Sequence, residues 1–332
     1  MPSKKISIII PAYNAEKVIS RTIKAVISQN FPSKDYEIIV VNDGSNDNTK
    51  KIVSGFKNVK LVNIVHGGAA KARNSGVVNA IGDIVAFTDA GCIPKKNWIK
   101  ELIKPFKDEN IVGVAGTYDT LNKKSLIARF FGYEIEQRHK KMKKLEEIDF
   151  VGTYNCAYRR SIFMELNGFS ESFGHKKKAV ANAEDPEFSF RMKKMGYKIV
   201  FQPKAIVSGD HPNTLWKYLM KKKSRAYWKV LLYKKHPLKT FGDAYTPKTL
   251  FPQIFLTGIF ITSIFLSIFE FKLFYLSLIS LFLSLLLNLD FYRFVWKKEK
   301  KVALFSPVIF LLRNIFSVFG IVHGIIDFFS KK

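Results

Sequence analysis

Short apolar runs alternate with helical patterns between residues 5 and 120. The runs are rich in β-branched residues and predict strands at residues 6–10, 36–41, 59–65, 83–88 and 111–115. Between residues 16 and 29, apolar side chains recur at helical spacing, which predicts an amphipathic helix. Strands that alternate with helices favour an α/β fold with a mostly parallel sheet that is covered on both faces.

The pattern is less regular from residue 125 onward. Residues 125–145 are helical in pattern and strongly basic, and residues 167–169 (Asn-Gly-Phe) predict a turn. Residues 183–186 (Ala-Glu-Asp-Pro) are expected to open a helix that stops at Gly196, because acidic residues and proline suit the first helical turn. A short strand is predicted at residues 197–201, and an aromatic, lysine-rich stretch follows from 214 to 239.

The composition changes at residue 249. Residues 250–269 and 273–289 carry no charge and are long enough to cross a membrane as a tight hairpin. Residues 302–326 form a third apolar region with Arg313 near its middle, which costs at least ~2.5 kcal/mol in a span. That region is therefore a third span or a re-entrant helix. We predict an α/β domain over residues 1–212, a juxtamembrane segment over 213–248 and a membrane domain over 249–332.

Basic residues dominate the 332-residue chain, which has a formal net charge of +27. Such a charge favours anionic partners, namely nucleic acid, membrane headgroups or phosphorylated substrates. Because the lysines cluster at residues 217–248 and 297–301, beside the predicted spans, we expect membrane lipids and no nucleic acid as partners. The same clusters place the large domain on the cytoplasmic side.

The amino terminus and the cysteines agree with a cytoplasmic location. The apolar run at residues 6–10 is far shorter than the apolar core of a signal peptide, so we expect the amino terminus to be retained. The two cysteines, Cys92 and Cys156, form neither a disulfide framework nor a spaced metal cluster, which suits a reducing compartment.

Polar residues follow several of the predicted strands. Asp89 ends the strand at 83–88, at the edge where open α/β sheets bind ligands. Four segments stand in a defined order: residues 8–14 (Ile-Ile-Ile-Pro-Ala-Tyr-Asn), 40–45 (Val-Val-Asn-Asp-Gly-Ser), 72–76 (Ala-Arg-Asn-Ser-Gly) and 88–91 (Thr-Asp-Ala-Gly). With the later Asn-Gly-Phe and Glu-Asp motifs, the chain resembles family 2 glycosyltransferases over roughly residues 5–235. The resemblance implies a GT-A fold and inverting sugar transfer from a nucleotide donor.

The resemblance implies a donor site built from the first three segments. Asp43 corresponds to the residue that binds uracil, and Pro11 and Tyr13 would line the same pocket. Lys71 and Arg73 follow two glycines at a helix start, where they are placed to neutralise a diphosphate. An ordinary Asp-Gly turn and charged residues on a helix surface are the alternative interpretations.

Asp89 corresponds to the first acid of the family's Asp-x-Asp motif, which binds ribose and a divalent metal. The implied cofactor is Mg²⁺ or Mn²⁺, held by oxygen ligands and substrate phosphates. Gly91 replaces the second acid, so the resemblance leaves the metal site incomplete. His211 is the candidate second ligand; a structural histidine before Pro212 is the alternative.

The acceptor side corresponds to Glu184 and Asp185. Inverting transfer requires a general base that reaches the attacking hydroxyl, and we assign this role to Asp185, with Glu184 assisting. Helix capping is the alternative role for both acids. The remaining acceptor-binding candidates are Asn155, Arg225 and Trp228.

The predicted enzyme is therefore an inverting glycosyltransferase. The Gln-x-x-Arg-Trp motif of processive synthases is absent at residues 222–228 (Lys-Lys-Ser-Arg-Ala-Tyr-Trp), which favours non-processive transfer to a lipid-linked saccharide. One alternative acceptor is polyprenyl or dolichyl phosphate. A second alternative is a membrane protein that binds nucleotide-sugar without catalysis. The sugar and the nucleotide are not determined by these residues, and UDP is implied only by the resemblance.

Overall fold

A computed structural model describes residues 6–173, 183–240 and 242–330. The chain divides into two compact units. The first contains residues up to Leu121 together with His139–Lys177 and Glu184–Asp210, and the second contains Asn122–Arg138, Lys178–Ala183 and His211–Lys332. Residues 122–138, which we had placed in the α/β domain, thus belong to the same unit as the C-terminal helices.

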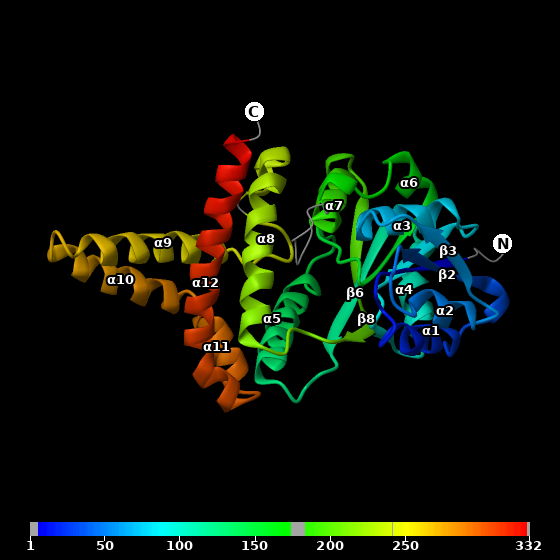
Figure 1. Cartoon of the computed structure of the whole chain (residues 1–332), viewed down its shortest axis with the longest axis horizontal. Helices are drawn as coiled ribbons and strands as arrows, with labels where there is room; N and C mark the ends of the chain where they lie inside the picture. The colour runs from blue at the N-terminus through cyan, green and yellow to red at the C-terminus, as the bar shows by residue number, and fades with distance from the viewer. Residues whose placement is uncertain (1–5, 174–182, 241, 331–332) are drawn as a thin grey trace. The chain divides into compact units, whose positions relative to one another are not determined.

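The first unit is built on a mixed sheet with the strand order β3-β2-β1-β4-β7-β6-β8-β5 (Figure 1). Its strands are β1 (Ile6–Ala12), β2 (Tyr36–Asp43), β3 (Lys60–Ile64), β4 (Ile84–Thr88), β5 (Ile93–Pro94), β6 (Ile111–Thr120), β7 (Asn155–Arg159) and β8 (Lys198–Gly209). Strands β1 to β4 pair in parallel, as expected. Strand β7 is antiparallel to both of its neighbours, β4 and β6. The predicted α/β class is confirmed, but the sheet is mixed: β6 and β8 pair in parallel, whereas β7 and β5 run antiparallel to their neighbours.

Helices connect these strands and form the second unit. They are α1 (Ile19–Ile27), α2 (Thr49–Ser54), α3 (Ala69–Val78), α4 (Trp98–Ile103), α5 (Leu126–Met142), α6 (Arg160–Glu165), α7 (Glu184–Lys194), α8 (Leu215–Lys235), α9 (Leu250–Leu266), α10 (Lys272–Leu286), α11 (Leu289–Trp296) and α12 (Lys300–Phe329). Short 3₁₀ helices lie at Ser33–Asp35, Lys104–Lys107, Glu171–Phe173 and Pro237–Lys239.

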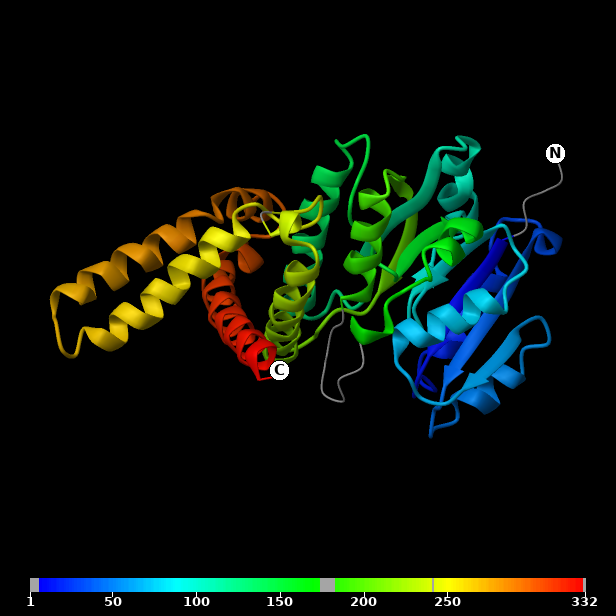
Figure 2. The ribbon, with the colours of Figure 1, turned by 90° about the horizontal axis from the view of Figure 1, so that it is seen from above.

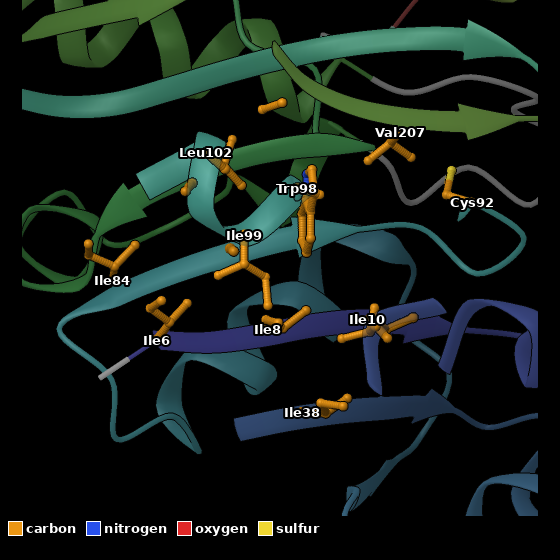
Figure 3. Packing of buried hydrophobic residues seen from close by; sticks show 14 of the residues in the cluster. Ile6, Ile8, Ile10, Ile38, Ile84, Cys92, Trp98, Ile99, Leu102 and Val207 are labelled. Carbon is orange, nitrogen blue, oxygen red and sulfur yellow. The ribbon is translucent and has the colours of Figure 1, made fainter. Parts of the chain in front are cut away.

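The core of the first unit forms where the apolar runs of β1, β2 and β4 meet the indole of Trp98. Figure 3 shows Ile8 and Ile10 of β1 together with Trp98 and Leu102 of α4 in one packed cluster. Each of these side chains is fully buried. Because the core fixes the strands, it also fixes the edge at which β1, β2 and β4 end, and the candidate site lies at that edge.

In the second unit, α8 and α12 lie side by side (Figures 1 and 2). Helices α9 and α10 form a hairpin (Figure 2). Small polar side chains are buried between the two helices, where Thr257 bonds Ser284, whereas large apolar side chains such as Phe265 and Phe282 are exposed. By length and hydropathy, α12 could cross a membrane, and α10 with α11, which meet at 49°, could form a second, broken span. Helix α9 is apolar but shorter. The three predicted apolar regions are therefore helical, and their insertion in a membrane stays a prediction.

Candidate active site

Asp43 ends β2 and is almost fully buried. Its two carboxylate oxygens accept hydrogen bonds from the backbone N–H groups of Gly67 (2.8 Å) and Gly68 (2.9 Å). Gly68 has φ +89° and caps the start of α3, a conformation that favours glycine. The imidazole of His66 lies 3.0 Å from the same carboxylate. The predicted nucleobase acid is thus held rigidly at the amino end of α3.

An aromatic pair stands next to Asp43. The rings of Tyr13 and His66 stack with centroids 4.2 Å apart, and Tyr13 is 46% exposed. Pro11, the neighbouring donor-site candidate on β1, is half-buried. A flat, partly exposed surface of this kind suits stacking with a nucleobase. His66 was not among the site residues predicted from the sequence; its position between β3 and the two glycines that open α3 was the available signal.

Lys71 lies over the loop that holds Asp43. A Cβ atom on Gly67 would come within 2.2 Å of Lys71 Cδ, so the stem of Lys71 lies directly across this glycine. The side chain is half-buried, and its amino group extends from the first turn of α3. A cation at a helix amino terminus adds to the positive end of the helix dipole, which is the arrangement that favours a bound phosphate.

Arg73 joins two of the predicted acids. Its Nη2 donates to Asp89 Oδ1 (2.7 Å), and its Nη1 donates to Glu184 Oε1 (2.9 Å). The Arg73 and Glu184 side chains are 5% and 6% exposed, whereas that of Asp89 is 36% exposed. Three segments far apart in the sequence therefore meet here: the end of β4, α3 and the start of α7. In this arrangement the Arg73 guanidinium contacts carboxylates, and its predicted contact with a donor diphosphate stays a prediction.

Glu184 and Asp185 occupy the first turn of α7, as predicted. Burial raises the pKa of Glu184, and the neighbouring Arg73 opposes this increase. Glu184 Oε2 is buried and has no hydrogen-bond partner among the residues that the structure describes. Asp185 is half-buried beside it, and its backbone carbonyl accepts a bond from Ser189 Oγ (2.8 Å). The acids therefore stand at a helix start, and capping and catalysis are compatible there.

Asp89 is the candidate ligand for a divalent metal. Gly91 has φ +95°, and a Cβ atom there would lie 3.5 Å from Val18 and 3.6 Å from Arg21 Nη2. The position of the missing second acid therefore faces α1. In the described parts of the chain, no group of three or more His, Cys, Asp or Glu side chains could hold a metal ion. Asp89 can supply one carboxylate, which fits a Mg²⁺ or Mn²⁺ ion that takes its other ligands from water and substrate phosphates.

Arg21, which the sequence analysis did not single out, lies beside this loop. Its Nη2 donates to the carbonyl of Gly91 (3.1 Å) and to Asp210 Oδ2 (2.6 Å). The end of β8 is thereby tied to the loop after β4. No local pattern in the sequence indicated this contact, because it joins residues in α1, in the loop and at the end of β8.

Asn155, an acceptor-binding candidate, bonds three protein groups in this structure. Its Oδ1 accepts from Trp98 Nε1 (2.7 Å), and its Nδ2 donates to the carbonyls of Thr117 (2.8 Å) and Ala205 (2.9 Å). The residue is 0% exposed. Because its amide connects β7, β6, β8 and α4 from inside the core, we leave Asn155 out of the proposed acceptor site.

Three other candidates belong to the second unit. His211 is buried and packs on Phe131, with ring centroids 4.9 Å apart. Arg225 lies over the same Phe131 ring (5.8 Å), and Trp228 is buried in α8. Asp43, Lys71, Arg73, Asp89, Glu184 and Asp185 all belong to the first unit. The predicted roles of His211, Arg225 and Trp228 stay predictions.

Comparison with known proteins identifies the family. Residues 7–166 match the family model described as glycosyl transferase family 2. The probable glycosyltransferase YdaM of Bacillus subtilis is 34% identical over 236 residues, which are 67% of this chain and 54% of that protein. The O-antigen chain rhamnosyltransferase RfbN of Salmonella typhimurium is 31% identical over 225 residues, 63% of this chain and 68% of that protein.

Two further comparisons concern substrates and fold. The Escherichia coli protein WfgD, a UDP-Glc:alpha-D-GlcNAc-diphosphoundecaprenol beta-1,3-glucosyltransferase, is 32% identical over 174 residues, 52% of this chain and 65% of that protein. The mannosyltransferase PcManGT from Pyrobaculum calidifontis, solved with GDP-Man and Mn²⁺, has a TM-score of 0.62 over 97% of this chain and 87% of its own, with 17% identity. At this identity the similarity establishes the fold alone. The chain spans about half the length of YdaM and about two thirds of RfbN and WfgD.

Proposed function

We propose, on the premise that this chain belongs to glycosyltransferase family 2, that it transfers a sugar from a nucleotide-diphosphate donor to a hydroxyl of a membrane-held, lipid-linked saccharide. The transfer proceeds with inversion and adds one sugar at a time. UDP-sugar is the proposed donor, since WfgD, one of the relatives, is named for a UDP-glucose donor and a diphosphoundecaprenol-linked acceptor.

The observation that carries the proposal is the pairing of Arg73 with both Asp89 and Glu184. In the family, the counterparts of the two acids serve opposite substrates: the first belongs to the donor motif and the second to the acceptor motif. Their common ion pair supports a single reaction centre where a donor and an acceptor meet.

The donor is proposed to bind along the ends of β1, β2 and β4. Its base would stack on Tyr13 and bond the carboxylate of Asp43, and Lys71 would neutralise a phosphate. Asp89 would contribute a ligand to Mg²⁺ or Mn²⁺, which supplies positive charge to the leaving diphosphate. A base that binds to Asp43 must share or replace the contact of His66.

The proposed reaction moves one proton, forms one bond to the anomeric carbon and breaks one bond from it. Asp185 accepts the proton of the acceptor hydroxyl, and the oxygen forms a bond to the anomeric carbon. The bond from that carbon to the diphosphate oxygen breaks on the opposite face, and the nucleoside diphosphate leaves with the electron pair. An ionised acceptor phosphate would need no base, so the requirement for Asp185 distinguishes the two kinds of acceptor.

The membrane would hold the acceptor. The exposed apolar side chains of the α9–α10 hairpin and the length and hydropathy of α12 support association with lipid. Lysines of α8 and of the segment between α11 and α12 favour an anionic cytoplasmic surface. We therefore propose that the catalytic unit works on the cytoplasmic side.

Replacement of Asp185 by asparagine tests the proposal. The variant is expected to lose sugar transfer by at least about 100-fold, because no general base remains, and to bind the nucleotide-sugar as the wild type does. Transfer is measured with membranes, a panel of radiolabelled nucleotide-sugars and extracted lipid-linked saccharides, followed by mass spectrometry of the products. Asp83→Asn, at the other end of β4, is the matched control and retains activity.

Two outcomes would contradict the proposal. Retained transfer by Asp185→Asn onto a polyprenyl phosphate would show that the acceptor is a phosphate. Binding of nucleotide-sugar without transfer by the wild type would instead indicate a binding protein.

A further inference from the structure

The segment Ala72-Arg73-Asn74 in α3 contacts the donor side and the acceptor side of the first unit. Ala72 is fully buried, and Arg73 and Asn74 point to different partners. The Arg73 guanidinium reaches Asp89, 16 residues away, and Glu184, 111 residues away. A single helical turn thus connects two acids that the sequence separates widely.

The chemistry of arginine accounts for the connection. Nη1 serves Glu184 and Nη2 serves Asp89, so each carboxylate has its own nitrogen on one rigid plane. Lysine has one compact charge on a flexible stem and does not present two fixed donor directions. Burial alone lowers the pKa of Arg73, but Asp89 and Glu184 outweigh burial and raise it, so the guanidinium stays charged.

Asn74 fixes a third segment in the same turn. Its Oδ1 accepts from the backbone N–H of Phe169 (2.9 Å), and its Nδ2 donates to the carbonyl of Phe169 (2.8 Å). Gly168 has φ +58°, and a Cβ atom there would come within 2.6 Å of Asn74 Oδ1. The Asn-Gly-Phe turn is therefore tied to α3 by a close approach that only glycine permits, and the Phe169 ring lies 6.0 Å from the Arg73 guanidinium.

The terminal nitrogens of Arg73 bond protein groups in this structure. Both terminal nitrogens bond carboxylates, its Nε is buried, and the side chain is 5% exposed. Asp89 keeps a partly exposed carboxylate, whereas Glu184 is almost completely enclosed. The position of Glu184, and of Asp185 next to it, therefore depends on Arg73, which also bonds Asp89.

We propose that Arg73 is a positioning residue that couples the donor acid Asp89 to the acceptor acids at the start of α7. This inference rests on the proposed transfer reaction. Arg73 sets the distance between the two substrates by holding Glu184, and it acts on the sugar acceptor through Asp185 without contacting the donor phosphates. Loss of the bridge lowers turnover and leaves the affinity for nucleotide-sugar unchanged.

The test is Arg73→Lys in the full-length protein, reconstituted in vesicles of anionic and zwitterionic lipid. We expect kcat to fall by about 100-fold, as for a catalytic group displaced by about 1 Å. The Kd of the nucleotide-sugar, measured by calorimetry with Mn²⁺ and without acceptor, should stay within about twofold of the wild type. Arg160→Gln is the control that keeps both values; the Nε of Arg160 donates to the carbonyl of Val77 at 3.5 Å. Weakening of the Kd in proportion to the loss of kcat would overturn the proposal, since it would make Arg73 a donor ligand.

A double variant keeps the test decisive. Glu184→Gln breaks the same bridge from the other side, so Arg73→Lys combined with Glu184→Gln should lose no more activity than the more affected single variant. Multiplying losses would overturn the coupling. If Arg73→Lys does not fold, Glu184→Gln alone provides the test: its kcat should fall while the Kd of the nucleotide-sugar stays within about twofold of the wild type. A wild-type protein that transfers no sugar refutes the proposed function and this inference with it, whereas an active wild type with an unaffected Arg73→Lys variant refutes the inference alone.

Discussion

Buried charges are arranged in opposite ways in the two compact units. In the first unit, one cation, Arg73, serves the carboxylates of Asp89 and Glu184. In the second unit, one carboxylate, Glu134 of α5, lies within 3.5 Å of Lys222, Arg138 and Arg313. The first network therefore has an excess of negative charge, and the second has an excess of positive charge.

The second network is enclosed by protein groups. Glu134 bonds Lys222 at 2.9 Å and also accepts from the hydroxyl of Tyr218 (3.1 Å). Arg313, the charge within the apolar helix α12, additionally bonds Asn314 and Gln253. Arg313, whose charge disfavours a third membrane span, is thus buried inside the unit and contacts Glu134 of α5 and Gln253 of α9.

Exposure distinguishes the roles of the two networks. Asp89 is 36% exposed, so the negative network opens toward solvent and can receive a cation or a substrate. Glu134, Arg313 and Lys222 are at most 8% exposed, so the positive network holds helices together. The first network therefore keeps one member accessible, whereas the second is largely enclosed, with Arg138 the most exposed member at 11%, and it carries the cost of desolvation.

Removal of the central carboxylate should have the largest effect on stability. Glu134→Gln leaves Arg138, Lys222 and Arg313 buried without their counter-charge, which is expected to lower the free energy of unfolding by about 3–5 kcal/mol. Thermal and denaturant unfolding in detergent measures this change. Glu136→Gln on the same helix is the matched control, because the pair of Glu136 with Lys298 is partly exposed and should contribute about 0–1 kcal/mol. Equal losses in both variants would contradict a special role for Glu134.

Acid should weaken the second network through the same carboxylate. Burial by itself would raise the pKa of Glu134, but Lys222, Arg138 and Arg313 outweigh it and lower the pKa to about 2. The unfolded chain, with the ordinary value of 4.5, binds the proton more readily, so the stabilisation is present above pH 4.5 and is lost as the pH falls to about 2. The difference corresponds to about 3 kcal/mol. Unfolding measured against pH should show this loss in the wild type and not in Glu134→Gln; parallel curves would disprove it.

The smallest expected effect concerns the missing acid of the first network. Gly91→Asp restores the Asp-x-Asp pattern, yet its Cβ would face Val18 and Arg21, so the new carboxylate should pair with Arg21. We expect the Kd for Mn²⁺, measured by calorimetry on the donor-free protein, to change by no more than about threefold. Gly91→Ala controls for the strain of a side chain at φ +95°. An increase in Mn²⁺ affinity of about tenfold or more would show that position 91 can join Asp89.

Local sequence patterns predicted most strands of the first unit and its helices α1 and α7, whereas α2, α4 and α6 were not predicted. The runs that became β1, β2, β3 and β4 are rich in β-branched residues, and they end within two residues of the predicted positions because polar turn residues follow them. The pattern missed β7, whose five residues, Asn-Cys-Ala-Tyr-Arg, carry no strand periodicity. That strand exists because it fills the position between β4 and β6, which is a tertiary requirement.

Some site residues could likewise be predicted from the local sequence, whereas the role of others depends on tertiary packing. Asp43, Asp89, Glu184 and Asp185 follow strands or begin a helix, and their residue types in the family order indicated a glycosyltransferase. Asn155 has the same kind of motif, but the fold places it within the core, where its amide is used by three protein groups. His66 and Arg21 carry no motif of their own and become part of the site only through their neighbours.

The sequence by itself determined the elements, the order of the motifs and the family, because these depend on residue type and on spacing along the chain. Only the tertiary structure decided that Arg73 binds Asp89 and Glu184, and that Arg313 in α12 is paired with Glu134 in α5. Ion pairs and hydrogen bonds require atoms to lie about 3 Å apart. Residues separated by 16 or 111 positions reach that distance only when the sheet and its helices are packed.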